Sequence, residues 1–143
     1  MRKVESFGVI PITRENEEYK VLLILHREGN HWGFPKGKAN PGEKHIETAC
    51  RELKEETNLE VKDILHMHAF IEHYHFRRKK EQIFKTAYYY PAIVEGVLKC
   101  QEEEIRDARW FSFVDALNQL SFKQARHILR ETMRLLHVEL PHE

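Results

Sequence analysis

The stretch from Gly37 to Leu59, GKANPGEKHIETACRELKEETNL, is the most informative part of the chain about its fold. Its charged residues stand at set distances after Gly37, at Glu43, Arg51, Glu52, Glu55 and Glu56. An α-helix from about His45 to Thr57 would gather one apolar face for packing on a sheet, made of Ile46, Ala49, Cys50, Leu53 and Thr57. The carboxylates of Glu52, Glu55 and Glu56 would then share an adjoining arc of about 100°.

These carboxylates destabilise the helix when it is considered alone. Glu52 and Glu56 are like charges at i,i+4, which costs roughly 0.2–0.5 kcal/mol. Glu55 and Glu56 also lie near the helix C-terminus, where the macrodipole disfavours anions. A bound divalent cation would reverse both effects, and an all-oxygen donor set suits Mg²⁺ or Mn²⁺. The alternative is a solvated acidic face balanced by nearby basic residues, and the matching offsets of Gly37 and Glu43 argue against it.

The stretch resembles the Nudix box, G-x5-E-x7-R-E-U-x-E-E-x-G-U, in which U is an aliphatic residue. The matching positions are Gly37, Glu43, Arg51, Glu52, Leu53, Glu55, Glu56 and Leu59. One position departs, since Asn58 stands where the box has glycine. Asn tolerates a positive φ better than other residues with a Cβ, so we expect the helix-ending turn to be kept at a small cost in stability. The resemblance implies an α/β Nudix fold, a mixed β-sheet sandwiched between helices, with the box at residues 37–59.

Composition sets modest bounds. A chain of 143 residues fits a single domain, residues 1–143, that buries roughly 70% of its unfolded surface. With 23 basic and 23 acidic residues, no overall field attracts nucleic acid or an anionic membrane. The N-terminus lacks the features of a signal peptide and no apolar run reaches about 18 residues. Cys50 and Cys100 have no metal-ligand spacing. We therefore expect a cytoplasmic protein with reduced thiols, no membrane contact and no stable nucleic-acid partner; its oligomeric state is left open.

Hydrophobic patterning predicts a mixed set of strands and helices. Expected strands span Phe7–Thr13, Tyr19–His26, Trp32–Phe34, Val61–Tyr74, Ile83–Val97 and Arg109–Phe111. Two helices should follow at about Val114–Leu120 and Lys123–His137, the second with an apolar stripe of Ile128, Leu129, Met133, Leu135 and Leu136.

Two further segments are similar to asymmetrically cleaving diadenosine tetraphosphate hydrolases. They are HWGFPKGKANPGE, from His31 to Glu43, and ARWFSFVDALNQLSFKQARHIL, from Ala108 to Leu129. This resemblance implies hydrolysis of a small dinucleoside polyphosphate, diadenosine tetraphosphate, to ATP and AMP, with Mg²⁺ as cofactor or Mn²⁺ in its place.

The catalytic residues expected from the resemblance are Glu52, Glu104 and Arg51. Glu104 lies in the run QEEEI and matches a family glutamate on a loop that closes over the metals. The metal ligands would be Glu52, Glu55, Glu56 and Glu104. Either Glu52 or Glu104 would act as the general base, a choice that depends on distances and pKa. Arg51 is expected to position other groups by pairing with Glu43.

The substrate-binding residues expected are His31, Lys36, Tyr74, Lys85 and Phe122. Lys36 lies in a glycine-bearing turn suited to phosphate contacts. Lys85 matches a family lysine near the polyphosphate. Tyr74 and Phe122 match positions that stack on adenine, an interaction worth roughly 1–3 kcal/mol per base. Phe122 could instead anchor its helix in the core, and Trp32 could be either a core residue or a cavity wall. The basic run at residues 77–80 is expected to be a solvated hairpin tip, with substrate guidance as the alternative.

Three functions are compatible with these patterns. The first is the dinucleoside tetraphosphate hydrolase. The second is a Nudix pyrophosphohydrolase acting on nucleoside triphosphates or on the 5′ end of RNA. The third is a non-catalytic nucleotide-binding module, which has no evident need for three crowded carboxylates.

Overall fold

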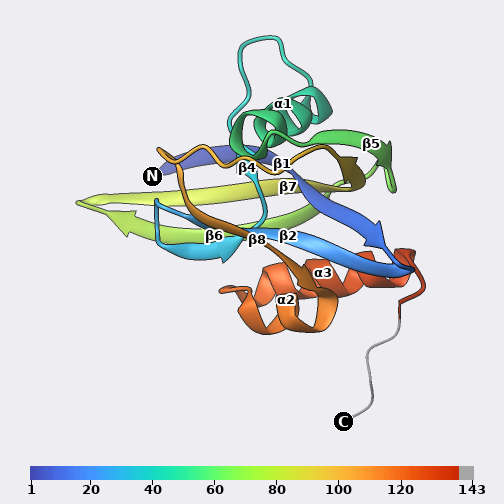
Figure 1. Ribbon diagram of the computed structural model, residues 1–143. Helices are drawn as coiled ribbons and strands as arrows, with labels where there is room; N and C mark the ends of the chain where they lie inside the picture. The colour runs from blue at the N-terminus through green and yellow to red at the C-terminus, as the bar shows by residue number, and fades with distance from the viewer. Residues whose placement is uncertain (139–143) are drawn as a thin grey trace.

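The computed structural model describes residues 1–138, which fold into a mixed sheet between helices (Figure 1). Helix α1 covers one side of the sheet, and α2 and α3 lie on the other. The α/β class and the sandwiched mixed sheet expected from the sequence are thus confirmed. The strands are β1 (Arg2–Glu15), β2 (Glu18–His26), β3 (His31–Gly33), β4 (Lys36–Gly37), β5 (Glu60–Ile64), β6 (Phe70–Arg78), β7 (Glu81–Glu95) and β8 (Ile105–Ser112). The helices are α1 (His45–Thr57), α2 (Phe113–Gln119) and α3 (Lys123–Leu135).

The sheet follows the order β3-β2-β1-β7-β5, with β4 added to β1, β6 to β7 and β8 to β2. Strands β1 and β7 run parallel, whereas the other pairs are antiparallel. Strand β1 pairs with β2 only from Ile12 onward, and nearer its start it pairs with β4 instead. The short β4 therefore takes the place beside β1 that β2 leaves, which brings Lys36 and Gly37 against the sheet next to α1.

The core is divided between the two faces of the sheet. In β1, Phe7 and Val9 belong to the cluster under α1, while Ile10 and Ile12 belong to the cluster under α2 and α3. This is the period-two alternation of a strand. Strand β2 is buried on both faces, which explains its nearly continuous apolar run VLLIL.

Several element bounds differ from the sequence expectation. The single strand expected at Val61–Tyr74 is wrong, because β5 and β6 are separate strands that pair with opposite halves of β7. Between them, the backbone N–H of His68 donates to the imidazole of His66, a local turn contact that hydrophobic patterning does not reveal. Strand β8 extends well beyond the expected Arg109–Phe111, and β4 was not expected. Helix α3 ends at Leu135, which is 38% exposed and so lies outside the buried stripe.

Helix α1 has the bounds expected for it, and Asn58 ends it as predicted. Asn58 adopts the left-handed conformation with φ of 67°, and its N–H donates to the carbonyl of Lys54 at 2.9 Å. Its side-chain amide also donates to the carbonyl of Val97 at 3.0 Å. The glycine position of the box thus tolerates this asparagine because asparagine adopts the left-handed conformation at little cost, and the segment after β7 gives its amide a partner.

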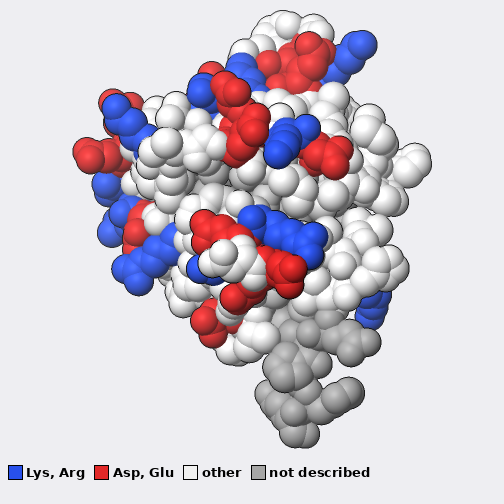
Figure 2. Space-filling view, turned by 45° about the vertical axis from the view of Figure 1, so that its right-hand side comes forward, with Lys and Arg blue, Asp and Glu red and all other residues white. Residues whose placement is uncertain are grey.

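The surface matches the balanced composition. On the face shown in Figure 2, acidic and basic side chains lie interspersed and neither sign covers a continuous area. Within the described residues, no helix is long and apolar enough to cross a membrane.

Candidate active site

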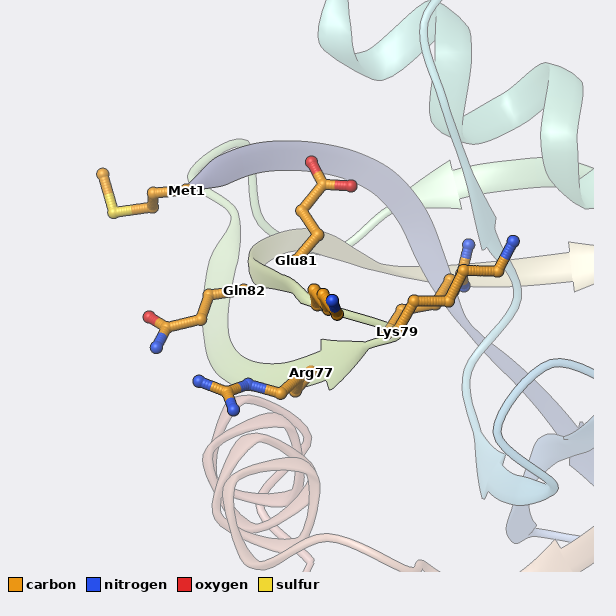
Figure 3. Close-up of a pocket in the computed structure, with 7 residues that line it drawn as sticks. Met1, Arg77, Lys79, Glu81 and Gln82 are labelled. Atoms are coloured by element: carbon orange, nitrogen blue, oxygen red, sulfur yellow. The ribbon is translucent and has the colours of Figure 1, made fainter.

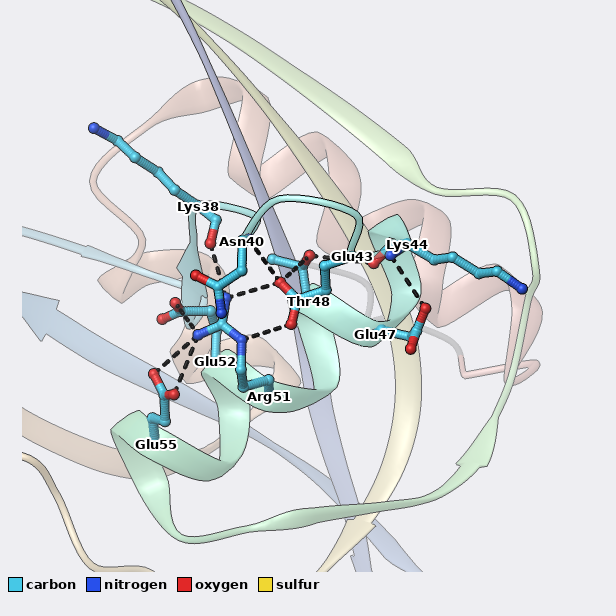
Figure 4. Close-up of polar contacts among 9 residues, drawn as sticks. All are labelled: Lys38, Asn40, Glu43, Lys44, Glu47, Thr48, Arg51, Glu52 and Glu55. Atoms are coloured by element: carbon cyan, nitrogen blue, oxygen red, sulfur yellow. Dashed lines mark hydrogen bonds and ion pairs between the residues drawn. The ribbon is translucent and has the colours of Figure 1, made fainter.

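Arg51 joins the loop before α1 to the helix itself (Figure 4). Its Nε donates to Glu43 Oε2 at 2.7 Å and its Nη2 to Glu43 Oε1 at 2.9 Å, so the expected pairing is present as a two-bond fork. The same guanidinium donates to the carbonyl of Lys38 and to the carboxylates of Glu52 and Glu55. The hydrogen bond from Arg51 lowers the pKa of Glu43 to about 2. Arg51 therefore fixes Glu52 relative to the loop that carries Gly37.

Only glycine fits at position 37, because the Glu52 carboxylate occupies the space that a side chain would need. A Cβ on this residue would lie 2.0 Å from the carboxyl carbon of Glu52. The backbone of β4 and the carboxylate of α1 thus approach each other as closely as a glycine permits.

Glu52, Glu56 and Glu104 form a compact carboxylate group, in which one oxygen from each lies within 4.8 Å of the others. Glu56 is 3% exposed, and its Oε2 has no hydrogen-bond partner within the described residues. Burial, together with the charges of Glu52 and Glu104, raises the pKa of Glu56 to about 9. A divalent cation bound by these all-oxygen donors would supply the missing partner and neutralise the repulsion, so the group fits Mg²⁺ or Mn²⁺.

Glu104 reaches this group from a loop held against the end of α1. The backbone N–H of Gln101 donates to the carbonyl of Glu56 at 3.0 Å, and the N–H of Arg27 donates to the carbonyl of Glu104, also at 3.0 Å. These bonds place the third carboxylate beside two that are far away in sequence. Glu55, in contrast, lies outside the group: its side chain is 53% exposed and bonded to Arg51. Its role as a metal ligand stays a prediction.

A cavity of about 1090 Å³ opens beside the carboxylates. It is lined by every substrate-binding residue expected from the sequence, namely His31, Lys36, Tyr74, Lys85 and Phe122, together with Glu52, Glu56 and Glu104. Trp32 is not part of this lining and packs edge-on against Phe111 in the core. Phe122 is 38% exposed, which excludes the alternative that it anchors its helix in the core.

Aromatic rings form a continuous row along the cavity wall. His26 stacks on His31 with ring centroids 4.6 Å apart, and His31 lies 4.9 Å from Phe122. Phe122 and Tyr74 face each other at 5.9 Å with an interplanar angle of 25°, and Phe76 lies 6.4 Å beyond Tyr74. Burial lowers the pKa of His26 to about 3 and that of His31 to about 4, so both rings are neutral near pH 7.

Two lysines line the same cavity and lie against this aromatic row. The Lys36 ammonium donates to the hydroxyl of Tyr74 and lies 4.5 Å from the centre of its ring. Burial, assisted by the charge of Lys85, lowers the pKa of Lys36 to about 8. Lys85 Nζ lies 5.4 Å from the Phe76 ring and 3.7 Å from a carboxylate oxygen of Glu28. Because both lysines line the cavity, phosphate oxygens that enter it would meet two positive charges.

The cavity residues that sequence reasoning did not single out include His26, Glu28 and Phe76. It also missed Glu72, a buried carboxylate whose charge acts on Lys36. Glu72 is 4% exposed, shares a hydrogen bond with Tyr89 and has an Oε2 without a partner within the described residues. Glu72 and Phe76 lie two residues to either side of Tyr74 on β6, so strand periodicity could have found them. The positions of His26 and Glu28 depend on how β2 meets β3 and gave no comparable signal.

The basic run is the tip of the β6–β7 hairpin, as expected. Figure 3 shows the side chains of Arg77, Lys79 and Gln82 spreading away from the turn. Arg78 turns instead toward the cavity, where it pairs with Glu28 and lies over the ring of Phe76 at 5.6 Å.

The NUDIX domain family model matches residues 2–135. The chain therefore belongs to the Nudix family, whose members generally use divalent metals, and is a Nudix hydrolase acting on nucleotide substrates.

Among individual relatives, the asymmetrical bis(5′-nucleosyl)-tetraphosphatase of Mus musculus is 30% identical over 125 residues, which are 85% of this chain and 84% of that protein. The m7GpppN-mRNA hydrolase of Saccharomyces cerevisiae is 29% identical over 132 residues, 87% of this chain but only 13% of that protein. A C. elegans Ap4A hydrolase solved as a binary complex has a TM-score of 0.70 at 20% identity, covering 94% of this chain and 98% of that one. The NUDIX domain of Shewanella oneidensis NrtR, complexed with ADP ribose, has a TM-score of 0.76 at 18% identity, with 95% and 90% coverage. These structures share the fold.

Proposed function

We propose that this protein hydrolyses diadenosine tetraphosphate to ATP and AMP. The observation that carries the proposal is the content of one cavity, where an open aromatic pair, two lysines and a carboxylate group are brought together. These three groups match the parts of such a substrate, which are a nucleobase, a polyanionic chain and the phosphate to be attacked. The similarity to the mouse tetraphosphatase over most of both chains supports the same assignment.

Glu52, Glu56 and Glu104 are proposed to hold Mg²⁺, with Glu55 as a further predicted ligand. A bound Mg²⁺ would neutralise phosphate oxygens and lower the pKa of water at this place. Arg51 keeps Glu52 oriented through its bond at 2.9 Å. The carboxylate of Glu52 or of Glu104 accepts the proton of the attacking water.

The lysines and the aromatic pair seat the substrate. Lys36 and Lys85 bind phosphate oxygens, which offsets the repulsion between the polyphosphate and the carboxylate group. Tyr74 and Phe122 stack on one adenine. Because the rings and the carboxylates are fixed in one fold, the length of the phosphate chain between them selects the phosphorus that is attacked. Attack at the phosphorus remote from the seated ATP-like half gives ATP and AMP and excludes two molecules of ADP.

A second candidate is hydrolysis at the 5′ end of RNA. The observation in its favour is that the basic β6–β7 tip adjoins the cavity through Arg77 and Arg78. The partial match to the yeast mRNA hydrolase points in the same direction.

Product analysis by chromatography separates these functions. Diadenosine tetraphosphate, dGTP and triphosphorylated RNA are incubated separately with enzyme and Mg²⁺, with Glu56→Gln as the matched inactive control. Rapid formation of equal amounts of ATP and AMP supports the proposal. Preferential consumption of the RNA or of dGTP would replace it with the second class, and binding without cleavage of any substrate would favour a nucleotide-binding module.

A further inference from the structure

The residues around the start of α3 bridge β3 and β6, two strands that line the cavity. Ser121 contacts β3, where its Oγ accepts from the N–H of Trp32 at 2.9 Å and its own N–H donates to the Trp32 carbonyl at 3.3 Å. Gln124 contacts β6, where its Oε1 accepts from the N–H of His73 at 2.7 Å and its Nε2 donates to the His73 carbonyl. Phe122 lies between these two attachment points.

The contact at Gln124 uses the edge of β6 that pairs with no other strand within residues 1–138. Strand β6 pairs with β7 on one side, where His73 is opposite Thr86. Backbone groups of successive residues in an antiparallel strand point alternately toward and away from the partner. The N–H and C=O of His73 point away from β7, and a single side-chain amide satisfies both, as a neighbouring strand would. This two-bond contact fixes the backbone immediately before Tyr74.

The spacing of the aromatic pair depends on where β6 and α3 stand. The Tyr74 and Phe122 rings are 5.9 Å apart. Bases stack at about 3.4 Å in nucleic acids, so a base between two rings needs a separation of roughly 7 Å. The centroid distance of 5.9 Å, which includes any lateral offset between the rings, is about one ångström below that width. Because Tyr74 follows His73 and Phe122 precedes Gln124 by two residues, the contact between His73 and Gln124 restrains both walls.

We propose that Gln124 is a positioning residue for nucleobase binding, acting through Tyr74 and Phe122 by tying β6 to α3. The proposal rests on the proposed function in that it assigns the aromatic pair to a base. Ser121 restrains Phe122 from the β3 side in the same manner. Gln124 does not act on the phosphates, so its removal weakens base seating and leaves the reacting groups in place.

The test compares Gln124→Leu with the wild-type enzyme in steady-state kinetics on diadenosine tetraphosphate. Leu keeps similar bulk and removes both hydrogen bonds at an exposed position. KM should rise about fivefold, the effect of losing one to two ordinary hydrogen bonds, while kcat stays within about twofold. Gln124→Glu keeps the acceptor for the His73 N–H but sets a carboxylate oxygen against the His73 carbonyl, so its KM should rise at least as much as that of Gln124→Leu. Gln82→Leu, the same change at the exposed hairpin tip, serves as control and should leave KM unchanged.

A double-mutant cycle shows whether Gln124 acts through Tyr74. In a Tyr74→Ala background, Gln124→Leu should change KM less than about twofold, because the wall that it positions is gone. Equal effects in both backgrounds, or a fall in kcat with KM unchanged, would overturn the proposal.

Amide hydrogen exchange at His73 distinguishes a wrong role for Gln124 from a wrong substrate for the enzyme. Faster exchange at His73 in Gln124→Leu, with the rest of the sheet unchanged, shows that the contact exists in solution. If the wild-type enzyme prefers another nucleotide, the same kinetics are run on that nucleotide, and an unchanged KM there contradicts the role of Gln124 whatever the substrate.

Discussion

Replacing Glu56 with glutamine should stabilise the metal-free protein. Burial raises the pKa of Glu56 from 4.5 to about 9, so near pH 7 the folded protein keeps a proton that the unfolded chain has released. The sign follows from proton linkage. The free energy of unfolding is not reduced by Glu56 below its unfolded pKa, and it falls as the pH rises from that pKa to the folded one. Each pKa unit corresponds to about 1.4 kcal/mol, so the cost near pH 7 is on the order of 3 kcal/mol and is under about 1 kcal/mol at pH 5.

Urea unfolding in EDTA at about pH 5 and pH 8 measures this difference. Glu56→Gln should exceed the wild type in free energy of unfolding at the higher pH, and the gap should nearly close at the lower one. Glu55→Gln is the matched control on the same helix, because its side chain is 53% exposed and should change stability by less than about 0.5 kcal/mol. Adding Mg²⁺ should stabilise the wild type and not Glu56→Gln. Equal or lower stability of Glu56→Gln at both pH values would refute the reasoning.

Other substitutions test separate parts of the site. Asn58→Gly should keep or raise the melting temperature because glycine adopts a φ of 67° without strain, whereas Asn58→Val should cost about 1 kcal/mol or more; the reverse order in thermal unfolding would contradict the turn. Gly37→Ala should leave the fold intact but reduce kcat by at least about tenfold, since its Cβ would displace the Glu52 carboxylate 2.0 Å away. The wild-type protein should lose stability as the pH falls from 6.5 toward 3, because the unfolded chain takes up a proton at His26 that the folded protein refuses. His26→Phe should flatten that decline in acid unfolding curves, and an unchanged slope would argue against a buried neutral ring.

Local features of the site could be predicted from the sequence. The bounds of α1, the pairing of Arg51 with Glu43 and the turn at Asn58 depend on residues only a few positions apart, where helix geometry dictates the contacts. The gathering of Tyr74, Phe122 and the two lysines in one cavity was expected only through resemblance to a family, because nothing in their spacing requires it.

Features that depend on tertiary contacts could not be predicted in the same way. The burial of Glu56 depends on the packing of α1 against β4, where the backbone N–H of Lys36 bonds to its carboxylate, whereas the helix pattern alone placed Glu56 at the border of the apolar face. The break between β5 and β6 gave no signal because apolar residues, Leu65 and Met67, continue through it and neither Gly nor Pro marks it. The contact of Gln124 with β6 joins residues 51 positions apart and has no local signature.

Hydrolysis of diadenosine tetraphosphate in H₂¹⁸O, followed by mass spectrometry of the products, tests the central claim most directly. In the proposed reaction, the separation between the aromatic pair and the carboxylate group selects one phosphorus, so the label should appear in AMP and be absent from ATP. Tyr74→Ala and Phe122→Ala should raise KM more than they lower kcat, because stacking on a remote base contributes similarly to the ground and transition states. Label in ATP, formation of two molecules of ADP, or an intact dinucleotide alongside rapid consumption of nucleoside triphosphates would contradict this account.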